Sequence, residues 1–357
     1  MDKERYKGIT CNAWSIAMIQ LAAILVTCGC TTQALLPVTN LEKNNNFGNS
    51  VPNQTEPAGL MPILNFSDCN ELHNSIKENI SRNSIRSGDG QIINNILSST
   101  DNLHSSAIFR FMPEQVVWFT RISGAISIQS LGTAIHESNH MIDALLTHCN
   151  DGFATYFYDG QVIATDHKFG DSPQYSVLAE SLPSKFKVNS IGSRFHQYIQ
   201  QNGSHAESDF SILLDELVAY TGAASFDISI LRSKEYSSLV NRDITGLDVN
   251  PGGMVDFMIY TLSYLKAIRV SYPDAYARLQ QQPKTLAFLQ SIWSAAEATL
   301  VSAYDLTKDA NTGGILIISR DAIGAAYSDE FLGELDRLRI KHASINSWRT
   351  SYLNSAN

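Results

Sequence analysis

The chain has 357 residues, of which 44% are hydrophobic and 17% are charged, so it can bury a sizeable core and form two lobes or domains. Its formal net charge at pH 7 is -9, and no cluster of Lys and Arg with interleaved aromatic residues occurs. Because nucleic-acid binding depends on Lys and Arg contacts to phosphate, this composition disfavours a nucleic-acid partner.

The first 30 residues are typical of an export signal and not of a folded element. Lys3, Arg5 and Lys7 form a positively charged start, and an apolar run covers residues 13 to 27. This run is short for a membrane-spanning helix and is followed closely by small residues. We therefore exclude residues 1–30 from the fold and treat them as a signal peptide.

The end of this signal, Leu25-Val-Thr-Cys-Gly-Cys30, resembles that of a bacterial lipoprotein. The resemblance implies cleavage and a lipidated cysteine, Cys28 or Cys30, at the new N-terminus. Neither cysteine fits the pattern fully, because Thr27 replaces a small residue before Cys28 and an apolar residue three positions before Cys30. The alternatives are a plain cleaved signal and an uncleaved membrane anchor.

Residues 31–62 are rich in Asn, Thr, Pro and Gly and show neither helical nor strand periodicity. Such a segment would serve as a flexible tether that holds a folded body away from a membrane surface. With the signal, it predicts an exported protein of the cell envelope, anchored in a membrane by an N-terminal lipid and facing the periplasm or the cell surface.

Only two cysteines, Cys69 and Cys149, lie in the expected folded body. In an oxidising compartment they would form one disulfide, whereas the alternative is two buried free thiols. The sequence does not decide between them, because a disulfide needs a specific Cα separation.

The first part of the body is expected to mix helices and strands. Two helices are predicted between residues 68 and 98. Residues 105–130 combine aromatic and β-branched side chains, which favours strand for at least part of this segment, above all for 116–119 or 125–128.

The most informative stretch carries His136, Glu137 and His140 in the order HExxH. On an α-helix, residues four apart lie on one face, so both imidazoles can reach one metal ion while Glu137 flanks an open coordination position. No Pro or Gly occurs from 133 to 148, and Ser130 is a suitable N-cap. The alternative without a metal site is a surface helix with solvated histidines. An apolar stripe at helical spacing favours the metal site, and it consists of Leu131, Ala134, Ile135, Met141, Ile142, Leu145 and Leu146.

This helix resembles the metal-binding helix of the zincin metallopeptidases, since residues between and around the ligands are uncharged, as Ser138 and Asn139 are here. The resemblance covers one helix only. It implies a Zn2+ cofactor, a peptide or protein substrate, and Glu137 as the general base. It also implies a strand near the helix that aligns the bound peptide, for which 116–119 and 125–128 are candidates, although both could be core strands.

A catalytic zinc usually has three protein ligands, so a third remains to be found. The metzincin pattern would need Gly at 143 and His at 146, where this chain has Asp143 and Leu146. Among the downstream carboxylates we choose Glu216, because residues 210–220 form a strongly apolar helix in which an unpaired carboxylate is costly to bury. The competing residues are Glu180, Glu207 and Asp215.

A Glu on a second helix resembles the arrangement of the gluzincins, the thermolysin-like branch. In that branch an acidic residue four positions later often hydrogen-bonds a zinc histidine, whereas here Tyr220 stands at that position. A phenol could do the same.

A β-hairpin should follow the HExxH helix, because Asp159-Gly160 suits a type I′ turn between 153–158 and 161–165. The remainder is expected to be helical, with glycine pairs at 252–253 and 313–314 as breaks and a short strand at 315–318. The helices should cover 254–270, 273–282, 285–304 and 329–345.

We therefore expect an α+β, mainly α protein of zincin-like, two-lobed architecture. The active-site helix would lie between a mixed α/β lobe (63–175) and a mainly helical lobe (176–357) that supplies the third ligand. Zn2+ would be held by His136, His140 and Glu216 for peptide hydrolysis with Glu137 as general base. The alternative is a non-catalytic exported lipoprotein or binding module on the same scaffold. The oxyanion donor stays open among Tyr156, Tyr158, Tyr175, His196 and Tyr220.

Overall fold

The computed structural model describes residues 69, 71–72, 88–122, 128–187, 194–200, 208–233, 249–307 and 320–344. The predicted signal, tether and short strand at 315–318 lie outside these ranges. Within them, α-helices predominate, and the one sheet is a two-stranded antiparallel hairpin. The predicted class, α+β and mainly α, is confirmed at this level.

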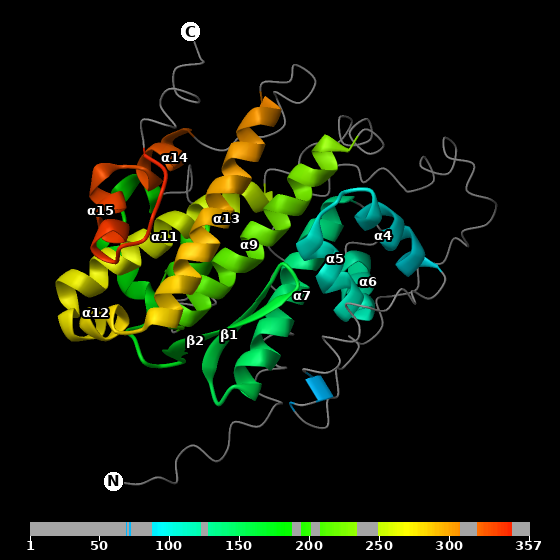
Figure 1. Cartoon of the computed structure of the whole chain (residues 1–357). Helices are drawn as coiled ribbons and strands as arrows, with labels where there is room; N and C mark the ends of the chain where they lie inside the picture. The colour runs from blue at the N-terminus through cyan, green and yellow to red at the C-terminus, as the bar shows by residue number, and fades with distance from the viewer. Residues whose placement is uncertain are drawn as a thin grey trace.

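Four long helices form the centre of the molecule (Figure 1). One of them, α9 (Phe210–Arg232), packs against the other three and is buried along most of its length. Because a helix that is apolar on all sides must be surrounded by other elements, its composition explains this central place. The other three are α7 (Ile128–Cys149), α11 (Val249–Ser271) and α13 (Pro283–Thr307).

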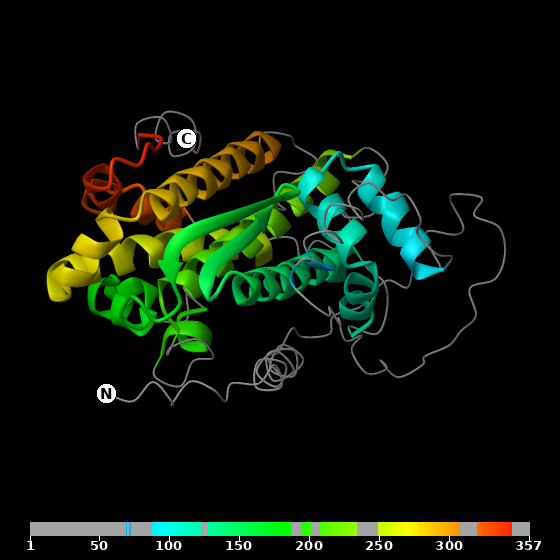
Figure 2. The same cartoon turned by 60° about the horizontal axis from the view of Figure 1, so that its bottom comes forward.

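Shorter helices lie at the two ends of this central group (Figures 1 and 2). One end holds α4 (Asp89–Ser98), α5 (Leu103–Phe111) and α6 (Pro113–Ile122), and the other holds α12 (Pro273–Gln280), α14 (Arg320–Ala326) and α15 (Asp329–Arg337). Four short helices complete the described elements: η1 (Tyr175–Val177), α8 (Leu178–Ser181), η2 (Ser184–Phe186) and η3 (Phe195–Ile199).

The strand predicted at residues 116–119 is wrong, because these residues lie in α6. Val116 and Thr120 are four residues apart and both fully buried, which is a helical spacing, and Pro113 occupies the first position of the helix, where its missing N–H is tolerated. Of the other candidate strand, Ile128 begins α7 and residues 125–127 lie outside the described ranges. Burial on a helical face has overridden the strand preference of these side chains.

Several predicted helix limits also need correction. Ser130 is not an N-cap, because α7 begins at Ile128. Gly252 and Gly253 do not break a helix but lie inside α11. The last helix, α15, ends at Arg337 and not at 345, since Arg339 adopts a positive φ of 60°.

The predicted hairpin is confirmed as β1 (Phe153–Tyr158) and β2 (Gln161–Lys168). Asp159 and Gly160 have φ angles of 49° and 77°, as a type I′ turn requires. β1 is the more buried strand and packs on α7 and α9, so the hairpin lies across both helices (Figure 2).

The structure joins Cys69 to Cys149 in a disulfide, with Cα atoms 5.3 Å apart. Of the two alternatives left open by the sequence, the disulfide is therefore the one that the fold accommodates, and it agrees with a protein outside the cytoplasm. It ties the last residue of α7 to a residue near the start of the body. Among the described helices, none has both the length and the apolar character needed to cross a bilayer.

Candidate metal centre

Two helices bring the predicted metal ligands together. His136 and His140 lie one turn apart on α7, and Glu216 comes from α9, which packs beside it. The two Nε2 atoms are 3.0 Å apart, and Glu216 Oε2 lies 3.7 Å from that of His136 and 3.6 Å from that of His140. In the described part of the chain this is the group of His, Cys, Asp and Glu side chains that could hold a metal ion.

These distances fit a single small ion. Ligand atoms at about 2.0–2.1 Å from a tetrahedral zinc ion lie roughly 3.3 Å from one another. The three observed separations, 3.0, 3.6 and 3.7 Å, fall on both sides of that value. Two imidazole nitrogens and one carboxylate oxygen are also a common donor set for zinc in hydrolytic sites.

The site is buried. His136 and Glu137 are each 4% exposed, His140 is 5% exposed and Glu216 is 1% exposed. Burial raises the pKa of Glu137 to about 7, an effect that the positive charge of His140 partly offsets. Burial by itself would lower the pKa of His140, but the carboxylates of Asp215 and Glu216 raise it well above its ordinary value.

Asp215, which the sequence suggested as a competing ligand, has a supporting place instead. Its Oδ2 atom lies 2.8 Å from His140 Nδ1, the ring nitrogen that faces away from Glu216. A carboxylate in this position fixes the ring orientation and leaves Nε2 for the metal. The adjacent pair Asp215 and Glu216 therefore supplies both a candidate ligand and the partner of another ligand.

A second buried carboxyl, that of Asp143, lies close enough to Asp215 for the two charges to interact. Burial raises the pKa of Asp143 well above its ordinary value, and the charge of Asp215 adds to the rise. Asp143 also accepts hydrogen bonds from the Phe157 backbone N–H at 2.6 Å and from Asn139 Nδ2 at 2.8 Å.

The other competing ligands do not join this group. Glu180 lies in α8, where its Oε2 accepts a hydrogen bond from Ser271 Oγ at 3.1 Å. Glu207 lies outside the described residues.

Tyr220 contacts the site by its ring and not by its hydroxyl. The ring centroids of Tyr220 and His136 are 4.2 Å apart. The hydroxyl of Tyr220 accepts a hydrogen bond from Arg194 Nε at 3.1 Å and lies 3.2 Å from that of Tyr198, while Arg194 also pairs with Asp256 at 3.0 Å. The carboxyl partner of a candidate ligand histidine is thus Asp215, whereas Tyr220 packs against the ring of His136.

The chain matches no protein-family model, no curated protein and no solved structure.

The remaining candidates for an oxyanion donor differ in how their polar atoms are engaged. Tyr156 donates its hydroxyl hydrogen to the Ser211 carbonyl at 2.9 Å, Tyr158 packs on His104, and His196 contacts Gln200. The hydroxyl of Tyr175 is buried without a hydrogen bond to any described residue. Burial, and after it the Glu216 carboxylate, raises the pKa of Tyr175 well above its ordinary value.

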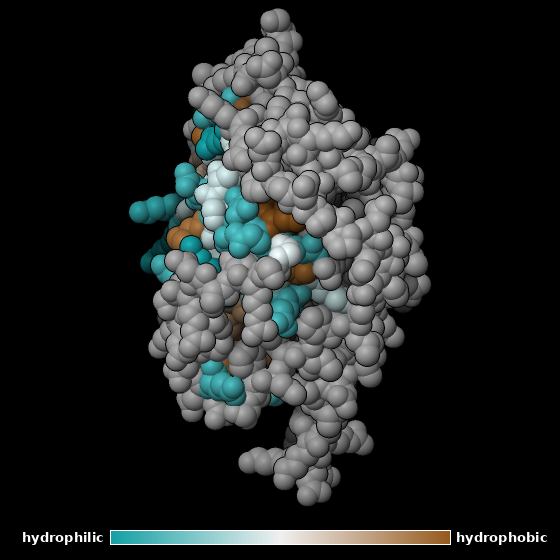
Figure 3. Space-filling model, turned by 90° about the vertical axis from the view of Figure 1, so that its right-hand side faces the viewer, coloured by the Kyte–Doolittle hydropathy of each residue, from teal (hydrophilic) through white to brown (hydrophobic). Residues whose placement is uncertain are grey.

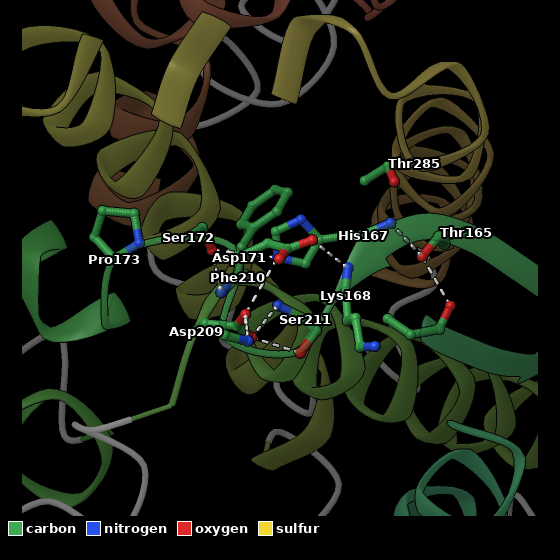
Figure 4. A network of polar contacts seen from close by, with 12 residues as sticks. Thr165, His167, Lys168, Asp171, Ser172, Pro173, Asp209, Phe210, Ser211 and Thr285 are labelled. Atoms are coloured by element: carbon green, nitrogen blue, oxygen red, sulfur yellow. Dashed lines mark hydrogen bonds and ion pairs between the residues drawn. The ribbon is translucent and has the colours of Figure 1, made fainter. Parts of the chain in front are cut away.

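A separate polar network holds the start of α9, two turns before Glu216 (Figure 4). Asp209 caps the helix by accepting from the Ser211 N–H at 2.9 Å, and it also accepts from the Gly170 N–H at 2.7 Å. His167 from β2 lies 3.2 Å from Asp209 and 3.1 Å from Gln282, before α13. The sequence did not reveal this cluster, because its members are distant in the chain.

The network joins a Ser, a His and an Asp, yet it lacks the geometry of a nucleophilic triad. Ser172 Oγ and Asp209 Oδ2 both contact the same ring nitrogen, Nε2 of His167. A triad needs them on opposite nitrogens, so that the base is free to take the serine proton. We therefore assign this network to the positioning of α9.

On the face seen in Figure 3, the described residues show mainly hydrophilic surface with small separate hydrophobic patches.

Proposed function

We propose that this protein is a zinc-dependent peptidase of zincin-like architecture. The observation that carries the proposal is the convergence of the HExxH helix α7 with Glu216 of α9, which places two imidazoles and a carboxylate within 4.8 Å of one another. Glu137 stands beside the first histidine on the same helix. Other divalent metals, including iron, accept the same donors, and zinc is proposed because the HExxH spacing is typical of hydrolytic zinc sites.

The reaction would need a metal, a base and a route for one proton. Zinc held by His136, His140 and Glu216 would polarise the scissile carbonyl and lower the pKa of water. Glu137 would take a proton from the attacking water and pass it to the nitrogen of the leaving amine. Asp215 would keep the ring of His140 oriented, and the buried hydroxyl of Tyr175 is our candidate for a hydrogen bond to the developing oxyanion.

In this proposal the ligands come from both expected lobes, the histidines from 63–175 and Glu216 from 176–357. The substrate would be a peptide or protein, and no nucleic acid would be involved.

Metal analysis tests the proposal most directly. The purified protein should contain close to one zinc after mild purification without chelators, and His140→Ala should contain much less, because a ligand is lost. A generic peptide substrate should be cleaved only by the zinc-loaded parent. A parent protein without bound metal would contradict both the cofactor and the enzyme class.

The alternative is a non-catalytic protein in which the same site holds a metal for structure. The burial of all four site residues, from 1% to 5% exposed, favours this alternative, because a substrate must reach the metal. Zinc content does not separate the two functions, but peptide cleavage does. A protein with one tightly bound zinc and no cleavage of any peptide in a diverse library would establish the structural role.

We further propose that the protein is exported and anchored to a membrane through a lipid on Cys28 or Cys30, as the signal resemblance implies. The Cys69–Cys149 disulfide supports export from the cytoplasm. Replacing both Cys28 and Cys30 by Ser should release the protein from the membrane fraction or block its processing. Unchanged fractionation with an unmodified N-terminus would contradict lipidation.

A further inference from the structure

Tyr220 is the residue of α9 whose ring packs on one of the candidate ligands. Its ring lies against that of His136, with the centroids 4.2 Å apart and the planes inclined by 59°. The other histidine, His140, has the carboxylate of Asp215 at 2.8 Å from its Nδ1. An aromatic ring can orient an imidazole only if the ring is itself held in place. The contacts of Tyr220 therefore bear on the position of His136.

Arg194, at the start of η3, holds the hydroxyl of Tyr220. Its Nε donates a hydrogen bond to that hydroxyl at 3.1 Å, and its Cζ lies 5.0 Å from the centroid of the Tyr220 ring. Another nitrogen of the same guanidinium, Nη1, donates to Asp256 Oδ2 on α11 at 3.0 Å. Because a guanidinium is planar and rigid, these two hydrogen bonds fix it relative to both α9 and α11.

Helix α11 encloses the ring of Tyr220 as well. Phe257 stacks on it, with the centroids 5.2 Å apart and the planes inclined by 22°, and a Cβ on Gly253 would lie 2.3 Å from it. Tyr220 is 6% exposed, so a closely packed interior surrounds its ring. The ring that contacts His136 is thus enclosed by α11 and tied at its hydroxyl to Arg194.

The ion pair of Arg194 and Asp256 needs an explanation beyond stability. Their side chains are 13% and 6% exposed. The cost of removing two charges from water can exceed their attraction, so apolar residues of similar size often serve a fold equally well. A phenylalanine at 220 would also fill the same space and need no hydrogen-bond partner. What the ion pair and the hydroxyl supply together is a fixed direction for the Tyr220 ring.

We propose that Arg194 is a positioning residue of the candidate metal centre. Held by Asp256, it fixes the ring of Tyr220 against His136 and keeps that imidazole in the orientation that metal binding needs. The inference rests on the proposed function, because it assumes that His136 binds the metal. The clamp formed by Arg194, Tyr220 and Asp256 then couples α11 to a site whose candidate ligands come from α7 and α9.

The test measures metal binding and coordination, so it does not depend on activity. Zinc affinity of the full-length protein is measured by competition with a chelator, and cobalt(II) is substituted for zinc so that its visible spectrum reports the ligand geometry. The ion-pair variant, Arg194→Met with Asp256→Leu, replaces the two charges by apolar side chains, so its metal-free form should unfold at a temperature close to the parent's. Its zinc affinity should nevertheless fall by about 10- to 100-fold, the range typical of losing an outer partner of a ligand, and its cobalt spectrum should change.

Tyr220→Phe is the conservative variant, because it keeps the ring on His136 and removes only the hydroxyl. It should lower zinc affinity by about 10-fold and change the cobalt spectrum in the same way.

The matched control is Arg269→Met with Glu334→Leu. This pair also joins α11 to another helix, α15, through a buried carboxylate, with Arg269 Nη2 at 2.8 Å from Glu334 Oε1. Its loss should leave zinc affinity and the cobalt spectrum unchanged, because neither residue contacts the clamp or joins the ligand group.

A double-mutant cycle identifies the route. If Arg194 acts through the hydroxyl of Tyr220, adding Tyr220→Phe to the ion-pair variant should weaken zinc binding little further. Additive losses, a folded ion-pair variant with the parent's affinity and spectrum, or the same spectral change in the Arg269 control would each overturn the inference.

If the ion-pair variant does not fold, Tyr220→Phe decides the question. A folded Tyr220→Phe protein with lower zinc affinity and a changed spectrum would support the inference, and one with the parent's affinity and spectrum would overturn it. Failure of both variants to fold would assign the clamp to the fold alone and also overturn the inference. A parent that binds no zinc would instead overturn the proposed function.

Discussion

Glu137 and Glu216 are both buried carboxylates beside the same two histidines, yet their replacement should have different effects. Glu137→Gln keeps the size of the side chain but cannot take a proton from water, so zinc should remain bound while peptide cleavage falls by at least about a hundredfold. Glu216→Ala removes a ligand, so zinc content and cleavage should fall together. Zinc stoichiometry and turnover are measured on both variants.

Glu180→Ala is the control for this pair, because Glu180 bonds Ser271 in the structure and does not join the ligand group. It should bind zinc and cleave peptide like the parent. If Glu216→Ala instead kept the parent's zinc affinity, the third ligand would be wrong, and Glu216 would be an ordinary buried residue of α9.

His104 on α5 should make the stability of the fold depend on pH. It is 1% exposed, and its Nδ1 accepts a hydrogen bond from the Asp159 N–H, so burial lowers its pKa from 6.5 to about 4. Below pH 6.5 the unfolded chain binds a proton that the folded chain does not, so stability should fall as the pH is lowered from 6.5 to 4. The full effect is about 3 kcal/mol.

The measurement is the free energy of unfolding between pH 4 and 7 for the parent and for His104→Gln. The variant should lose less stability over this interval, because Gln does not titrate. The nearby titratable groups, Tyr158 and Asp159, are the same in both proteins. Parallel pH profiles would show that His104 does not carry the effect.

Single residues also show how far the sequence could be used to predict the site. The grouping of His136, His140 and Glu216 was predictable, the two histidines because their spacing is local and Glu216 because a carboxylate in so apolar a helix needs a partner. The place of Asp215 was not predictable. Adjacent helix residues point in directions about 100° apart, so only the packing of α9 on α7 shows that Asp215 reaches His140 while Glu216 faces the metal ligands.

Among the secondary-structure elements too, those with a local sequence signal were predictable, and those decided by packing were not. The hairpin was predicted because Asp159-Gly160 is a local turn signal, and the long helices because their apolar spacing is regular. The strand expected at 116–119 failed because aromatic and β-branched residues favour strand only where a sheet receives them, and here Val116 packs from a helix into a helical core. The helix break predicted at the glycine pair 252–253 is wrong, because Gly253 serves the close packing of two helices and does not end one.

Gly253 allows α11 to lie close to α9 at Tyr220. A Cβ atom on Gly253 would lie 2.3 Å from the ring of Tyr220, which packs on His136. Gly253→Ala should therefore displace a buried ring, destabilise the protein by about 1–3 kcal/mol and weaken zinc binding. Thermal unfolding with and without zinc measures both effects.

Gly324→Ala is the matched control, since a Cβ added there, in the helix α14, meets no atom of the described residues within 4 Å. It should be neutral or stabilise the protein by up to about 1 kcal/mol, because Ala favours helix over Gly. Equal destabilisation by both variants would show that the contact with Tyr220 is not the cause.

For the whole molecule, one contiguous set of buried side chains runs from Leu72 to Ile340. The candidate metal centre lies where the helices α7 and α9 meet inside this core. The N-terminal part of the body is joined to this core by a covalent link as well, because Cys69 is bonded to the last residue of α7, 80 residues later in the chain.

That link should contribute strongly to stability. A disulfide that closes a loop of this length restricts the unfolded chain, and its loss typically costs about 2–5 kcal/mol. The double variant Cys69→Ala with Cys149→Ala should therefore unfold at a lower temperature than the parent, and reduction should lower the unfolding temperature of the parent but not that of the variant.

Zinc stoichiometry should be kept in the double variant, because His136 and His140 lie at least two turns before Cys149 on α7 and are held by α9. Free thiols at both Cys69 and Cys149 in unfolded, unreduced parent protein, located by thiol labelling and peptide mapping, would contradict the bond. Loss of zinc from a variant that stays folded would show that the candidate metal centre depends on it.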